Sequence, residues 1–96
     1  MKDAYYPGDT ATVRLDDLRL NGVKVYSGAV IMFDVYDGDV VVANGSGVQD
    51  GTKNNWLLMF NIPLTTVPPT TLKVESVTVY EGASKKHVAL VPVGVE

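Results

Sequence analysis

The chain has 96 residues, with 8 Lys or Arg against 11 Asp or Glu, so its formal net charge is −3 at pH 7. This length predicts one domain over residues 1–96 and excludes a large enzyme with a deep enclosed pocket. Phosphate binding needs clustered basic residues, and Lys85-Lys86 is the only adjacent basic pair. We therefore expect no nucleic acid as partner.

The absence of Cys means that no disulfide supports the fold and that an antibody-type bridge between sheets is excluded. Residues 1–7 lack the apolar centre of a signal peptide. No stretch approaches the roughly 18 apolar residues that a membrane span needs. We expect a protein that is made in the cytosol and does not bind a membrane.

The β-branched residues, 17 Val, 2 Ile and 8 Thr, are spread along the chain and interrupted about every ten residues by Gly, Pro or Asn. Short apolar runs between regular turn signals are typical of an all-β sandwich or barrel. No segment has the apolar spacing of a helix over three turns. The sequence predicts about seven strands and little or no helix.

The first strand is predicted over residues 10–15, where Ala11, Val13 and Leu15 alternate with polar residues. Leu18 and Leu20 follow at even positions, whereas the apolar residues of the first strand are at odd positions. A bulge or bend is therefore expected at Asp16-Asp17, which would return both sets to the same face. A turn at Asn21-Gly22 then leads into a short strand over residues 23–26.

A β-hairpin is predicted in the middle of the chain. Its strands are residues 30–36 and 39–43, and Asp37-Gly38 forms the turn between them. Residues 49–55 are polar and are expected to form a loop.

Residues 56–62 form the next predicted strand, which places four apolar side chains on one face: Trp56, Leu58, Phe60 and Ile62. The prolines that follow cannot donate to a ladder, so the sheet is expected to break there.

Two strands are predicted in the last third of the chain, over residues 71–80 and 87–93. In the first of them Leu72 and Val74 occupy even positions, whereas Val77 and Val79 occupy odd positions. In a regular strand the two pairs would therefore lie on opposite faces. This shift predicts a bulge near Ser76 or a strand that changes sheets.

Catalysis has little support in the sequence. A nucleophilic triad would need His87, the only His, which begins an apolar run beside two lysines and is better explained as a surface residue at a strand end. Zinc sites usually combine several His and Cys. We therefore expect a protein that is not an enzyme and has no metal or other cofactor.

A ligand could bind at the loops. Asp34, Asp37 and Asp39 lie within six residues, and Asp9 and Asp50 could reach the same end of a sandwich, where carboxylates could hold Ca²⁺. The favoured explanation is that Asp37-Gly38 serves the hairpin turn, because the fuller acidic run of a calcium loop is missing.

Aromatic residues could stack on a sugar, although Trp56 begins an alternating apolar series and is better explained as part of the core. The candidate ligand-loop residues are therefore Tyr26, Tyr36, Asp37, Asp39 and Asp50.

Three runs, residues 30–33, 40–43 and 56–60, are apolar on both faces, whereas a strand of a sandwich needs only one apolar face. Loops could cover part of the second face. A contiguous exposed patch, however, usually marks a protein interface, and we favour that interpretation. The candidate interface residues are Leu57, Met59, Val77, Val79 and Ile31.

Three segments carry a resemblance to known domains: Pro7-Gly8-Asp9-Thr10, the hairpin residues 35–39 (Val-Tyr-Asp-Gly-Asp), and the strand from Trp56 to Ile62-Pro63. They resemble macroglobulin-type domains and small immunoglobulin-like proteins of tailed bacteriophage particles, over roughly residues 7–93. The resemblance implies an immunoglobulin-like sandwich of about seven antiparallel strands in two sheets.

The resemblance to phage proteins implies a structural virion component, such as a head decoration, neck or tail accessory protein. It would be synthesised in the host cytoplasm, and its partners would be other virion proteins or copies of itself. No catalytic residue is implied. The alternative is a sandwich module that binds carbohydrate or a cell surface, because the fold alone does not decide function.

Overall fold

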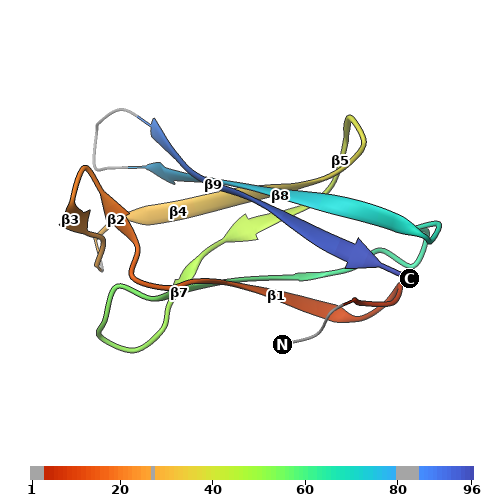
Figure 1. The fold of residues 1–96 in the computed structure, drawn as a ribbon, viewed down its shortest axis with the longest axis horizontal. Helices are drawn as coiled ribbons and strands as arrows, with labels where there is room; N and C mark the ends of the chain where they lie inside the picture. The colour runs from red at the N-terminus through yellow and green to blue at the C-terminus, as the bar shows by residue number, and fades with distance from the viewer. Residues whose placement is uncertain (1–3, 27, 80–84) are drawn as a thin grey trace.

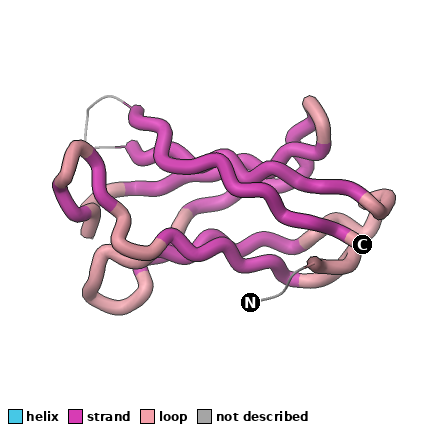
Figure 2. Tube along the Cα trace, in the orientation of Figure 1, coloured by secondary structure: helices cyan, strands magenta, loops and turns pink. Residues whose placement is uncertain are grey.

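The computed structural model describes residues 4–26, 28–79 and 85–96, and these residues form an all-β fold without a helix (Figure 2). The strands of the described residues are, in chain order, β1 (Thr10–Leu15), β2 (Arg19–Leu20), β3 (Val23–Lys24), β4 (Val30–Asp37), β5 (Val40–Ser46), β6 (Val48–Gln49), β7 (Trp56–Asn61), β8 (Thr70–Val79) and β9 (Lys85–Val95). The predicted all-β class is confirmed.

Two sheets make up most of the molecule and lie one above the other (Figure 1). One has three strands in the order β1-β7-β6, and the other has four in the order β5-β4-β8-β9. The strands β2 and β3 form a separate two-stranded ribbon. All neighbouring strands within these sheets are antiparallel.

The three-stranded sheet contributes the apolar faces that the alternation predicts. Ala11 and Val13 of β1 are buried, and they pair with Phe60 and Leu58 of β7, which are buried as well. Trp56 is 4% exposed, so its predicted place in the core is confirmed.

Strand β4 contributes the opposite side of the core. Ile31, Phe33 and Val35 are buried, whereas the residues between them face outward. The rings of Phe33 and Phe60 have centroids 6.3 Å apart, so they meet across the two sheets. Burial of such side chains is the main favourable contribution to folding.

The hairpin turn lies one residue later than predicted. Asp37 pairs with Val40, so the two central residues are Gly38 and Asp39 rather than Asp37 and Gly38. Gly38 has φ +65°, and a positive φ at the first central position is what favours Gly in such turns. The register shifts between Val35 and Tyr36, which gives β5 one unpaired extra residue, Val42.

The predicted irregularity near Ser76 lies in the neighbouring strand. Strand β8 alternates regularly, because every second residue from Leu72 to Thr78 is buried: Leu72, Val74, Ser76 and Thr78. The extra residue is Val88 of β9, because Ser76 pairs with Ala89 and the next residue pairs with His87. The predicted end of the strand at Tyr80 lies outside the described residues.

The bend predicted at Asp16-Asp17 is a tight turn rather than a bulge, and Asp17 has φ +50°. Asn54 is buried, and its Nδ2 donates hydrogen bonds to the Asp17 carboxylate (2.9 Å) and to the Leu18 carbonyl (3.1 Å). The hydrogen bond from Asn54, followed by that from Arg19, lowers the pKa of Asp17. The turn is thus held to the loop before β7.

Candidate protein-interaction faces

The outer face of the four-stranded sheet, which we call face A, begins with two apolar cross-strand rows. Val30 pairs with Val79, and Met32 pairs with Val77. Val30 and Met32 are 50% and 52% exposed, whereas the two valines of β8 are half-buried. Side chains in directly opposite positions touch, so these four residues form a continuous apolar surface.

The third and fourth rows of face A carry charge. Asp34 pairs with Glu75, and Tyr36 pairs with Lys73. Like charges in directly opposite positions destabilise a sheet. The Oε1 atom of Glu75 lies 3.6 Å from the Nε2 atom of His87, which offsets part of this repulsion when the His is protonated.

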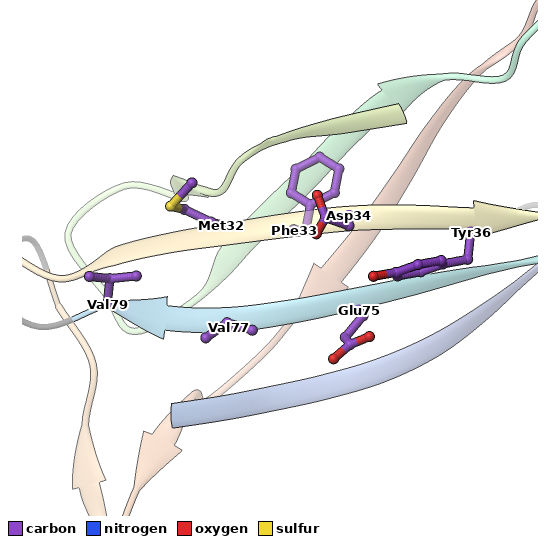
Figure 3. A pocket seen from close by; sticks show the side chains of 7 residues that line it. All are labelled: Met32, Phe33, Asp34, Tyr36, Glu75, Val77 and Val79. Atoms are coloured by element: carbon purple, nitrogen blue, oxygen red, sulfur yellow. The ribbon is translucent and has the colours of Figure 1, made fainter. Parts of the chain in front are cut away.

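A depression of about 160 Å³ lies on face A, and Figure 3 shows side chains of β4 and β8 around it. This volume is below the roughly 300 Å³ of the smallest ligand pockets. Its lining residues are Met32, Phe33, Asp34, Tyr36, Glu75, Val77 and Val79. Face A is therefore suited to contact with another surface rather than to enclosing a substrate.

The outer face of the three-stranded sheet, which we call face B, is also partly apolar. Met59 is 48% exposed and Val48 is 55% exposed, and Leu57 lies half-buried beside Val48 as its cross-strand partner. Strand β1 borders this surface with Thr12, which pairs with Met59. The molecule thus exposes apolar side chains on both of its broad sides.

Arg14 places a cation on face B and pairs with Leu57 across the strands. Its Nη2 atom lies 3.2 Å from the Asp16 carboxylate and 3.2 Å from the Asp50 carboxylate. The hydrogen bond to Asp16 is the largest of the effects that raise the pKa of Arg14, and Asp50 adds to it. All three side chains are exposed, so each ion pair contributes little to stability.

The predicted interface residues are divided between these faces, with one correction. Leu57 and Met59 lie on face B, and Val77 lies with Val79 on face A. Ile31 is 0% exposed and belongs to the core, so it is not part of either face. It alternates with its neighbours in β4, and both neighbours point outward.

Met32 and Glu75 lie on face A but are not among the residues that the sequence predicts for an exposed face. A signal was present for the first of them, because Asp34 lies in phase with Met32, and a charged residue marks the solvent side of a strand. No such signal exists for the pairing of Asp34 with Glu75, because it joins positions far apart in the sequence.

The predicted ligand-loop residues lie at three separate places, with Tyr36, Asp37 and Asp39 together at the β4–β5 hairpin. Tyr26, 45% exposed, precedes β4, whereas Tyr36 lies near the end of that strand. Asp37 accepts a hydrogen bond from Thr70 Oγ1 (3.3 Å), and Asp39 lies in the hairpin turn. Asp50 lies beside Arg14 of face B.

Among residues 4–26, 28–79 and 85–96, no group of three or more His, Asp or Glu side chains is placed to hold a metal ion. The part of the chain that the structure describes contains no helix of the length and apolarity needed to cross a membrane. Comparison of the chain with protein-family models, with curated proteins and with solved structures found no match.

Proposed function

We propose that the protein is a non-enzymatic assembly module, an immunoglobulin-like sandwich that binds other proteins through faces A and B. The resemblance to phage proteins makes a tailed-bacteriophage particle its proposed location, with other virion proteins or copies of itself as partners. One observation carries the proposal: both broad sides of the sandwich expose apolar side chains.

The strand order supports the immunoglobulin-like part of the proposal. In these sandwiches strands B, E and D share one sheet, and strands C, F and G share the other, with C′ added beside C in some members. If β1 is equivalent to B, the order β1-β7-β6 corresponds to B-E-D, and β5-β4-β8-β9 corresponds to C′-C-F-G.

Exposed apolar patches support the assembly part of the proposal. Scattered apolar residues are ordinary on a surface, but contiguous patches mark protein contacts and promote aggregation when they are left uncovered. Met32 with Val77 forms the centre of such a patch on one side, and Met59 with Leu57 does so on the other. A subunit with two opposite patches contacts two neighbours at once.

Site-specific photocrosslinking tests this proposal. A diazirine amino acid replaces Met32 on face A or Met59 on face B, and the protein is irradiated in cells that produce it naturally. The matched control is Leu64, an apolar loop residue that is 82% exposed and lies outside both faces. We expect adducts from both faces, in at least about fivefold higher yield than from the loop. Equal yields at all three positions, or none, would contradict the proposal.

A carbohydrate-binding module is the second candidate, and the depression on face A favours it. There Tyr36 lies beside Asp34 and Glu75, and an aromatic ring with nearby carboxylates can stack on a sugar and accept its hydroxyl hydrogen bonds. Glycan-array binding that Tyr36→Ala abolishes and Tyr26→Ala preserves would support this function. Absence of binding to any glycan would count against it.

A further inference from the structure

Along the two central strands of face A, β4 and β8, the outward side chains change from apolar to charged. From Met32 along β4 the side chains are apolar, then acidic at Asp34, then aromatic at Tyr36. Their partners on β8 are Val77, then acidic Glu75, then basic Lys73. The surface therefore changes from apolar to negative to positive in three successive rows.

Face B also has an apolar side chain followed by two rows that carry charge, but the charges have the opposite signs. Its first row contains Met59, paired with Thr12. The next row contains Arg14, paired with Leu57, which in turn pairs with Val48. Beyond it lies Asp16, and both Asp16 and Asp50 are in ion-pair contact with Arg14. The charged groups that follow Met59 therefore change from positive at Arg14 to negative at Asp16 and Asp50, with Leu57 and Val48 beside Arg14.

The spacing of the rows is the same on both faces, because outward-facing residues of a strand follow each other at two residues, about 6.8 Å. If Arg14 of one copy lies over Asp34 and Glu75 of another, Met59 falls on the apolar row of face A. Asp16 then falls towards Lys73. In this arrangement β1 of one copy runs in the same direction as β4 of the other.

A two-fold contact of face A with itself has no such match. An axis along the strands places each row on itself, so the Asp34–Glu75 rows of both copies meet, whereas an axis across the strands reverses the order of the rows. In the reversed order, if the Met32–Val77 row meets itself, the Asp34–Glu75 row lies against the apolar Val30–Val79 row. If the acidic row meets itself, four carboxylates meet. If the acidic row of each copy meets the Tyr36–Lys73 row of the other, the two apolar rows of each copy extend past the last β4–β8 pair of its partner and are left uncovered.

We infer that copies of this chain stack head to tail, with face B of one copy on face A of the next and with Arg14 placed over the Asp34–Glu75 pair. The inference rests on the proposed function and names its partner as a second copy of the chain. Contacts between two different faces repeat, so they form an open stack or a closed ring rather than a dimer.

The existing ion pairs of Arg14 do not oppose this contact. They lie at the surface, where such pairs contribute little to stability. In the stack Arg14 would face two further carboxylates, Asp34 and Glu75, whose mutual repulsion it relieves. Because these contacts are electrostatic, the stack is expected to weaken as salt is added.

Light scattering coupled to size exclusion, over a concentration series, tests the inference on the full chain. The wild-type mass is expected to rise past that of a dimer. Arg14→Glu and Glu75→Arg each place like charges together at the contact, so each is expected to weaken association about tenfold or more. The double variant R14E/E75R restores opposite charges and is expected to recover most of it.

Two controls change the net charge equally outside the central rows: Lys53→Glu matches Arg14→Glu, and Asp39→Arg matches Glu75→Arg. Both are expected to keep association within about twofold of wild type. Circular dichroism checks that every variant is folded. A discrete dimer that Arg14→Glu leaves intact, or a double variant no better than the single ones, would overturn the stack.

The photocrosslinking result separates failure of the stack from failure of the proposed function. If the wild-type chain remains monomeric while faces A and B crosslink to a different protein, stacking is wrong and the assembly function stands. If the chain remains monomeric and neither face gives adducts, both are wrong. Adducts of the chain with itself, formed at both Met32 and Met59, support both.

Discussion

Replacement of Trp56 with alanine is expected to lower the free energy of unfolding by about 3–5 kcal/mol. The indole is 4% exposed and belongs to the buried core between the sheets. Its Nε1 atom donates a hydrogen bond of 3.0 Å to the Val25 carbonyl, which holds the segment after β3 against β7. The substitution leaves both a cavity and a carbonyl group without this donor.

Urea denaturation measures this effect. Circular dichroism serves as the signal instead of Trp fluorescence, because the variant lacks the only Trp of the chain. Trp56→Phe is the matched control: it keeps an aromatic ring but removes the donor, so a smaller loss of about 1–3 kcal/mol is expected. A loss below about 1 kcal/mol for Trp56→Ala would contradict the placement of this side chain in the core.

Replacement of Gly47 with valine is expected to destabilise the protein by about 3 kcal/mol. Gly47 lies between β5 and β6, where the chain leaves the four-stranded sheet and enters the three-stranded one. A Cβ atom at this position would lie 2.9 Å from Leu58 Cδ2 and 3.2 Å from Ile31 Cβ. Both neighbours are fully buried, so little space is available for them to move.

The same urea titration tests this prediction, with Ser46→Val as the matched control. Ser46 is the preceding residue and is exposed, so the same side chain there is expected to change stability by less than about 0.5 kcal/mol. Combining Gly47→Val with Leu58→Ala frees space beside the new side chain. The combined loss is therefore expected to be smaller than the sum of the single losses. An additive result would show that Leu58 is not the group that the valine displaces.

The all-β class and most of the interior face follow from the sequence alone. Strict alternation places Ala11 and Val13 in the core, and it does the same for Trp56, Leu58 and Phe60. Such a pattern is local, because successive side chains of a strand point to opposite sides. Apolar runs on both phases also showed that some apolar side chains would remain outside the core.

The sequence pattern failed where the interior is polar or where a strand takes an extra residue. Ser76 and Thr78 occupy buried positions that the pattern assigns to apolar residues, so the shift in phase suggested a bulge in the wrong strand. The hairpin turn differs by one residue for a related reason. Pairing of Asp37 with Val40 is a property of the two strands together and not of the turn sequence alone.

The organisation of the surface, in contrast, depends on the fold of the whole chain. The fold excluded Ile31 from the exposed faces and placed Val77 and Met59 on opposite sides of the sandwich. It also brought Asp34 beside Glu75, and Arg14 beside Asp50. These contacts depend on which strands become neighbours and in what register. Packing of the whole chain determines both, whereas alternation within one strand determines only which side chains share a face.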